Sequence, residues 1–199
     1  MCGRYYVADD LADRLEAMKQ AFGKSDLSAL PGAMRAGDVR PSREAIVLAS
    51  RNDVISAVPM RWGFTAFEGG KLLINARAET ARQKKTFASS IERRRCAIPA
   101  SRFYERNAAG EQVSFRRSDG QMLFLAGFYR PQHDGDRFII LTTAANESML
   151  PLHDRMPLLL KAEDVRAWTD DNTRLDGFLR AEQPALTREQ EYEQLTLDF

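Results

Sequence analysis

The most reactive group that this sequence offers is at Cys2, because removal of Met1 would expose an α-amine beside the thiol. This pair is a 1,2-aminothiol, which captures aldehydes without a cofactor: the amine forms a Schiff base, and the thiol closes on the imine carbon to give a thiazolidine. Reference pKa values of about 7.7 to 8.0 for an α-amine and about 8.5 for a thiol leave both nucleophiles usable near neutral pH. A cysteine at position two is equally compatible with no catalytic role.

Three further polar residues stand in apolar or turn-like surroundings far from Cys2 in sequence: Asn75, Glu105 and His153. Glu105 follows Phe103-Tyr104, and apolar neighbours raise the pKa of a carboxyl group towards the range useful for proton transfer. Histidine titrates in that range without any perturbation. The alternatives are a surface Glu105 paired with a neighbouring arginine, and a His153 that is bonded to the backbone of a turn.

The elements that must position these residues can be predicted from hydrophobic periodicity and turn signals. A helix is expected from Asp9 to Phe22, with Gly23 ending it, and residues 24–42 are expected to form a long loop. Strands are expected at 2–7, 45–49, 54–60, 96–98, 103–105, 113–117, 122–128, 137–143 and 157–160. Two hairpins are predicted, with turns at 51–53 and 118–120. Short helices are expected at 163–169 and 173–180.

This order of elements predicts an α+β domain with a curled, mostly antiparallel, barrel-like sheet and flanking helices. We expect residues 1–182 to form the domain and residues 183–199 to form a weakly held polar tail.

Composition narrows the classes of function. The 199 residues are 44% hydrophobic, which is enough for one core. No run approaches the roughly 18 apolar residues of a membrane span, so we expect a cytoplasmic protein. Two cysteines and two histidines lie far apart, which predicts no disulfide framework and no metal site, with Cys96 a buried apolar residue and His133 in a loop.

The net charge of the chain does not by itself indicate a nucleic-acid partner. The formal net charge is +1, so any binding of a polyanion must be local. Short basic runs at 82–85, 93–95 and 116–117 are typical of solvated faces more often than of binding sites.

The phrases MCGR, RWGF, INARAET, RRCAIPASRFYE, TTAAN and HDRMP occur in this order and, with the spans between them, cover residues 1 to about 160. Together they resemble the SOS-response-associated peptidase (SRAP) family, whose members crosslink themselves to abasic sites in DNA. The resemblance implies that processed Cys2 is the nucleophile, that Asn75 positions it, that Glu105 transfers protons and that His153 polarises the sugar oxygen. It implies no cofactor and a single-stranded DNA partner.

The resemblance also implies DNA-binding residues. Arg4 and Arg77 match positions that contact phosphates beside the lesion, and Arg155 is expected to join them, because the arginine fork grips phosphate oxygens bidentately. An internal ion pair of Arg77 with Glu79 is the alternative. Trp62 is expected to stack on a base or, alternatively, to lie in the core.

Weaker candidates for lining the same cleft are Pro41 and Thr143. The chain departs from the family pattern at Asp38, Arg40, Ser101, Arg102 and Arg106, where arginines would replace stacking with charge. A late family phrase near the C-terminus is not recognisable.

The leading hypothesis is a DNA-damage-response protein that forms a covalent thiazolidine crosslink with abasic single-stranded DNA. We expect it to act as a monomer and to be nucleoid-associated when bound to DNA. Two alternatives remain: a thiol peptidase that uses Cys2, acting on its own N-terminus or on other chains, and a single-stranded DNA-binding module without chemistry.

Overall fold

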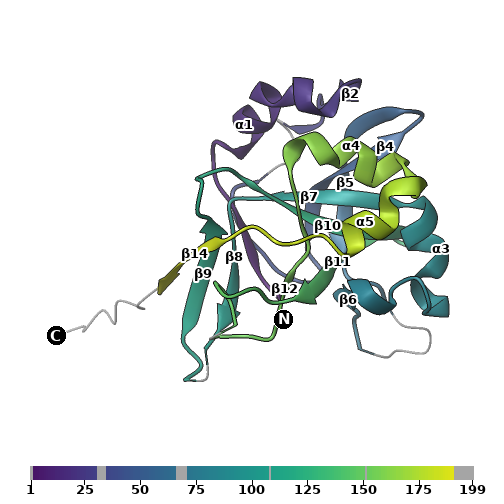
Figure 1. Cartoon of the computed structure of the whole chain (residues 1–199). Helices are drawn as coiled ribbons and strands as arrows, with labels where there is room; N and C mark the ends of the chain where they lie inside the picture. The colour runs from purple at the N-terminus through teal and green to yellow at the C-terminus, as the bar shows by residue number, and fades with distance from the viewer. Residues whose placement is uncertain (1, 31–34, 66–70, 108, 151, 191–199) are drawn as a thin grey trace.

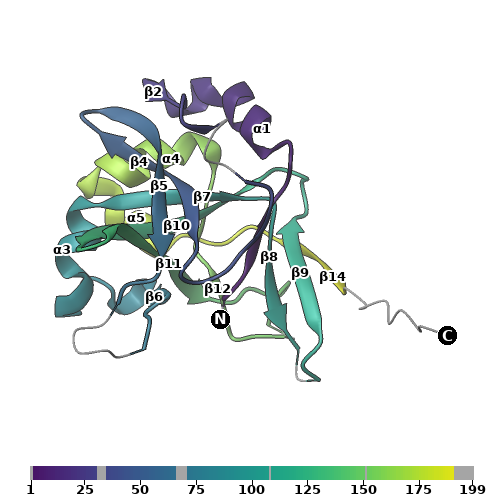
Figure 2. The same cartoon turned by 180° about the vertical axis from the view of Figure 1, so that it is seen from behind.

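The computed structural model describes residues 2–30, 35–65, 71–107, 109–150 and 152–190. In this part of the chain, two β-sheets meet in one core. Helices α3 (Lys85–Arg93), α4 (Val165–Asp170) and α5 (Leu175–Leu179) lie on one side of the molecule. Strands β8 (Arg102–Arg106), β9 (Gln112–Arg117) and β14 (Leu186–Gln190) lie on the opposite side (Figures 1 and 2).

The smaller sheet has the strand order β14-β9-β8-β1-β3, and all of its pairings are antiparallel. Its strands are β1 (Tyr5–Val7), β3 (Gly37–Val39), β8 (Arg102–Arg106), β9 (Gln112–Arg117) and β14 (Leu186–Gln190). Along each strand, side chains alternate between the two faces. Tyr5, Phe103 and Phe115 therefore point into the core, where all three are fully buried.

The larger sheet has the order β12-β11-β10-β7-β4-β5-β2, with β13 paired to β10 and β6 paired to β11. Its strands are β2 (Ser25–Asp26), β4 (Glu44–Arg51), β5 (Val54–Trp62), β6 (Asn75–Arg77), β7 (Arg95–Ala100), β10 (Leu123–Gln132), β11 (Gly135–Ala144), β12 (Arg155–Pro157) and β13 (Leu159–Leu160). Strand β11 also pairs with β5; this pairing and those of β6 with β11 and β2 with β5 are parallel, and the others are antiparallel. The prediction of an α+β fold with a mostly antiparallel sheet is confirmed.

Helices α3 and α4 pack against the middle of the larger sheet, where α3 contacts β10 and β7 and α4 contacts β7 and β4. The α-helices are α1 (Leu11–Ala17), α3 (Lys85–Arg93), α4 (Val165–Asp170) and α5 (Leu175–Leu179), and the 3₁₀ turns are η1 (Lys19–Phe22), η2 (Ala78–Thr80), η3 (Ala162–Asp164) and η4 (Asn172–Arg174). The helix expected from residue 9 to 22 forms as α1 and η1, separated at Met18. Gly23 ends it with a φ of +65°, a conformation that glycine adopts readily. Within the described ranges, no helix is long and apolar enough to cross a membrane.

The first predicted hairpin is confirmed. Strands β4 and β5 pair from Glu44 opposite Arg61 to Arg51 opposite Val54. The two turn residues, Asn52 and Asp53, have φ values of +51° and +60°, as a two-residue turn with both residues left-handed requires.

The second predicted hairpin is wrong. Strands β9 and β10 do not pair with each other; β9 pairs with β8 and β14, whereas β10 pairs with β7, β11 and β13. The Ser118-Asp119-Gly120 turn therefore carries the chain from one sheet to the other. The actual hairpin joins β8 to β9, where the Asn107 side chain accepts a bond from the Glu111 N–H at 2.9 Å.

Two expectations about irregular segments also need correction. The expected loop at 24–42 contributes β2 and β3, although residues 31–34 of it lie outside the described residues. The expected tail begins with an ordered segment, since β14 pairs with β9 from Leu186 opposite Arg117 to Gln190 opposite Val113. Residues 183–190 therefore belong to the folded domain, because backbone pairing holds the edge of the small sheet; 191–199 lie outside the described residues.

Candidate active site

Cys2 lies inside the protein, shortly before β1 begins at Tyr5, and is only 1% exposed. Its main-chain carbonyl accepts a hydrogen bond of 2.9 Å from the side-chain Nδ2 of Asn75. Its thiol donates to the main-chain oxygen of Arg4 at 3.6 Å. Burial, together with the nearby Glu105 carboxylate, raises the pKa of the Cys2 thiol to about 12. The thiol is therefore held in its protonated form.

Asn75 is the first residue of β6, which runs parallel to the end of β11. The neighbouring β12 pairs with the other edge of β11, so that Thr142 stands between Arg77 on β6 and Pro157 on β12. This arrangement brings the Asn75 segment and the segment before β12 to one end of the large sheet. Asn75 Oδ1 is buried and has no hydrogen-bond partner within the described part of the protein.

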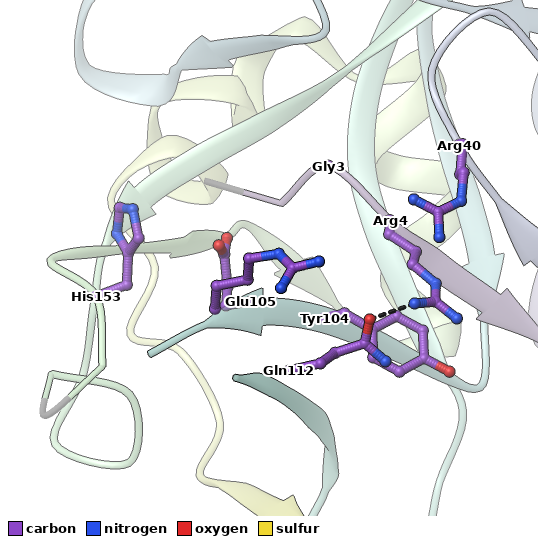
Figure 3. A pocket seen from close by; sticks show the side chains of 8 residues that line it. Gly3, Arg4, Arg40, Tyr104, Glu105, Gln112 and His153 are labelled. Carbon is purple, nitrogen blue, oxygen red and sulfur yellow. Dashed lines mark hydrogen bonds between the residues drawn. The ribbon is translucent and has the colours of Figure 1, made fainter. Parts of the chain in front are cut away.

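A cavity of about 380 Å³ lies next to the N-terminal segment: Gly3 and Arg4 line it, whereas Cys2 and Asn75 are not among its lining residues. Figure 3 shows Glu105 and His153 at one end of this cavity, and Arg4, Tyr104 and Gln112 at the other. The site therefore combines residues from the segment before β1, the residue after β3, strands β8 and β9, and the segment before β12, far apart in sequence.

Glu105 is 7% exposed, so the alternative of a solvated strand residue is wrong. It lies on β8 two residues after Phe103, and this alternation turns both side chains towards the interior. Burial raises the pKa of the Glu105 carboxyl above its ordinary value of 4.5, and the charge of His153 opposes this shift. Glu105 thus interacts electrostatically with both Cys2 and His153.

His153 is half-buried, and its Nδ1 accepts a hydrogen bond of 2.9 Å from the main-chain N–H of Arg155. Asp154 Oδ1 lies 2.8 Å from the same nitrogen, but one nitrogen does not accept and donate at once. The amide always donates, and Asp154 is 81% exposed, so we assign Nδ1 as the acceptor and place the proton of the neutral ring on Nε2. The expected bond to the backbone is present, and it leaves Nε2 as a donor.

The three predicted phosphate-binding arginines differ in their surroundings. Arg4 bonds to Gln112 and Asp38, and its guanidinium lies 4.4 Å from the centre of the Tyr104 ring. Arg77 is exposed.

Arg155 is engaged internally. Its guanidinium grips both carboxylate oxygens of Glu79, at 2.7 and 2.8 Å, and donates to the Thr142 carbonyl at 2.6 Å. Glu79 is therefore bound by Arg155, in place of the alternative ion pair with Arg77. In this structure Arg155 fixes the start of β12 rather than presenting its fork to a phosphate.

The structure contradicts the prediction that Trp62 stacks on a base. The indole is fully buried, donates from Nε1 to the Ile74 carbonyl at 3.0 Å, and stacks on Phe138 with the ring centroids 6.2 Å apart. The apolar flank of the RWGF phrase and the pairing of β5 with β11 place it in the core. Pro41 and Thr143 are not among the residues that line the 380 Å³ cavity, and Thr143 faces a different cavity.

Several lining residues escaped sequence reasoning. Tyr104 enters the sequence-based prediction only as a neighbour of Glu105, and Gln112 is absent from it. Recognition of the β8–β9 hairpin would have indicated Gln112, because this pairing sets Gln112 opposite Arg106. Gly3 also lines the cavity.

The two cysteines are both free and buried. Among the described residues, no group of three or more His, Cys, Asp or Glu side chains is arranged to hold a metal ion. The donors that converge on the cavity are a carboxyl group, an imidazole and guanidinium groups, a set suited to proton transfer and anion binding.

The fold and this N-terminal site define one class of protein. The sequence model of the family "SOS response associated peptidase (SRAP)" matches residues 1–196, and the chain belongs to this family.

Similar proteins include abasic site processing protein YedK of Escherichia coli (strain K12), which is 30% identical over 176 residues covering 84% of this chain and 79% of that protein. Abasic site processing protein YoaM of Bacillus subtilis (strain 168) is 27% identical over 198 residues, covering 91% and 84%. A crystal structure of a Bordetella bronchiseptica protein superposes with a TM-score of 0.76 at 24% identity, covering 96% of this chain and all (100%) of that one. This last likeness concerns the fold alone.

Proposed function

We propose that this protein binds single-stranded DNA at abasic sites and, once Met1 is removed, forms a covalent thiazolidine with the sugar through Cys2. One observation carries the proposal: Asn75 holds the Cys2 carbonyl at 2.9 Å beside a buried Glu105 that shares its cavity with His153. Membership of the family and relatives named abasic site processing proteins support it.

The first chemical step is the opening of the abasic sugar, which is mostly a closed hemiacetal. A proton must reach the ring oxygen while the anomeric hydroxyl loses one, and the C1 carbonyl forms as the ring bond breaks. Glu105 suits this exchange, because a carboxyl with a raised pKa is protonated over more of the working pH range. In the proposed mechanism, His153 donates from Nε2 to the sugar oxygen.

The second step joins protein and sugar. The Cys2 amine adds to C1, and water leaves to give an imine; the Cys2 sulfur then bonds to the same carbon while its proton passes to the imine nitrogen. The sum is aldehyde plus aminothiol giving thiazolidine plus water, without an oxidant, metal or cofactor. Asn75 Oδ1, buried beside the Cys2 backbone, is the proposed acceptor for the amine N–H.

Binding of the flanking phosphates is assigned to Arg4 and Arg77. Arg4 borders the cavity and Arg77 lies exposed on β6, two residues after Asn75. We propose that Arg155, through Glu79, acts as a positioning residue for the His153 segment.

The test is a denaturing gel of the processed protein mixed with an abasic oligonucleotide. A slower-migrating band is expected with the wild type, and none with Cys2→Ala. Reduction of the abasic aldehyde to an alcohol with borohydride before mixing should also remove the band. A Cys2→Ala band as strong as the wild-type band would refute the proposal. Binding without any covalent product would instead favour a DNA-binding module.

The same site favours a second activity, hydrolysis of the bond between residues 1 and 2 of the chain itself. Cys2 is next to that bond, and the Glu105 carboxyl interacts with Cys2. Intact-mass measurement on protein with Glu105→Gln decides this point. Met1 retained in the variant but lost from the wild type supports self-processing, whereas equal loss of Met1 assigns removal to an aminopeptidase.

A further inference from the structure

Arginine and tyrosine side chains alternate across the outer face of the small sheet. The guanidinium of Arg4 lies 4.4 Å from the ring centre of Tyr104, that of Arg102 lies 5.9 Å from Tyr104, and the same Arg102 lies 4.5 Å from the ring of Tyr6. We call these four residues the Arg-Tyr ladder. Each contact is within the distance at which a cation is attracted to an aromatic face.

The ladder follows from the pairing of β1 with β8. Tyr6 is directly opposite Arg102, and the Tyr104 N–H bonds to the Arg4 carbonyl at 3.0 Å. Even-numbered residues of both strands thus share the face opposite to the buried Phe103. Cross-strand contacts hold the guanidinium groups over the rings, so they are preorganised for a ligand.

The ladder joins the cavity next to the N-terminal segment to a second cavity of about 240 Å³. Arg4 and Tyr104 line the first cavity, and Tyr6 and Arg102 line the second. At about 3.3 Å per strand residue, Arg102 lies about 10 Å along β8 from Glu105. The two cavities are thus adjacent sites on one surface.

Arginines gather around the second cavity, which is lined by Arg14, Arg116 and Arg117 as well as by Arg102. Arg116 is paired with Glu189 and Arg117 with Asp119. Arg14 donates to the Gly120 carbonyl at 3.3 Å, and no ion pair of Arg14 with a carboxylate is found in the described ranges. A chain with a net charge of +1 thus carries four arginines around one small cavity.

We propose that the ladder and this second cavity bind the backbone of single-stranded DNA on one side of the abasic nucleotide, with Arg14 and Arg102 contacting phosphates. This inference rests on the proposed function and extends its site. Alternating cations and aromatic rings suit a single strand, whose phosphates and unpaired bases need both kinds of contact. An acidic peptide offers carboxylates but no bases to lie against Tyr6.

The experiment measures dissociation constants for oligonucleotides with the abasic nucleotide at the 5′ end, in the middle, or at the 3′ end, across a series of salt concentrations. For the wild type, loss of nucleotides on one side only should weaken binding. Arg102→Gln and Arg14→Gln should each weaken binding of the central-lesion oligonucleotide about 10- to 150-fold, as loss of a charge-assisted contact does. Each should also lower the salt slope by about 0.7.

Arg102→Lys separates charge from stacking, since it should keep most of the salt slope but lose affinity. Arg93→Gln is the matched control, because Arg93 is an exposed arginine on α3, on the side of the molecule away from β8 (Figure 1). Melting temperatures verify that each variant is folded.

Affinities and salt slopes of Arg14→Gln and Arg102→Gln that match those of Arg93→Gln would overturn the inference, while wild-type crosslinking in the same samples would leave the proposed function standing. Displacement by polyglutamate that depends on Arg102, with no such dependence for DNA, would also overturn it in favour of an acidic protein partner. Loss of DNA affinity in the variants without crosslinking by any protein would support the ladder and refute the chemistry.

Discussion

Replacement of Asn75 by alanine tests whether the N-terminal site is preorganised. The Asn75 Nδ2 group donates a hydrogen bond of 2.9 Å to the Cys2 carbonyl, and this bond links β6 to the N-terminal segment. Asn75→Ala removes the only side-chain donor that the structure shows at this carbonyl among the described residues, and it leaves both the carbonyl and the reacting amine less constrained.

The size of the effect follows from this one bond. A buried carbonyl left without its donor costs about 1 to 3 kcal/mol. If that free energy is lost only when the amine is placed for attack, the crosslinking rate at saturating DNA falls about 5- to 150-fold. Asn75→Asp should be at least as slow, because a carboxylate cannot donate to the carbonyl.

The assay is single-turnover crosslinking at saturating abasic DNA, followed by denaturing gel. Asn146→Ala is the matched control: its amide donates to the main-chain oxygens of Gln183 and Pro184, at 3.1 and 2.9 Å, far from Cys2 in sequence. That variant should lower the melting temperature but not the rate. A wild-type rate for Asn75→Ala would refute the view that the held carbonyl organises the site.

Three further predictions follow from the same contacts. Glu105→Gln should slow crosslinking in a gel time course. Burial raises the pKa of the Glu105 carboxyl above 4.5, so the folded wild type loses stability relative to the glutamine variant as pH rises through that raised pKa. The difference in melting temperature in favour of the variant should therefore be smallest below pH 4.5. An advantage that shrinks with rising pH would contradict this sign. Arg77→Ala should mainly weaken DNA binding and its salt dependence in titrations, and an equal loss of rate at saturating DNA for this variant and Glu105→Gln would contradict the division of roles. Trp62→Ala should lower the free energy of unfolding by about 3 to 5 kcal/mol in urea titrations, as large core deletions do, whereas a mere loss of DNA affinity would restore the stacking role.

Much of the fold could be predicted from the sequence because local patterns determine it. The β4–β5 hairpin follows from two apolar runs around Asn52-Asp53, whose residue types tolerate positive φ. The prediction of a β9–β10 hairpin was wrong because the turn sequence Ser118-Asp119-Gly120 indicates only that the chain reverses. It does not report which strand becomes the partner, since pairing across two sheets depends on contacts distant in sequence.

The candidate site was predicted unevenly for a similar physical reason. Glu105 and His153 border one cavity, but residue type alone cannot distinguish an arginine that faces solvent from one held by a carboxylate. Arg155 is held by Glu79, and this pairing requires β6 and β12 to flank the same strand. Trp62 shows the same limit for aromatic residues, whose surfaces serve a core as well as a base.

The burial of Cys2 bears on the order of the chemistry. Because burial raises the pKa of the Cys2 thiol to about 12, the thiol is almost entirely protonated at neutral pH. The thiol is therefore a poor first nucleophile, and reaction must begin at the amine, which exists only after residue 1 is removed. Protonation of the imine nitrogen then places a positive charge beside the sulfur, and a neighbouring positive charge favours the thiolate. Burial thus keeps the thiol from reacting with unrelated electrophiles. The thiol becomes reactive only after the amine has captured an aldehyde.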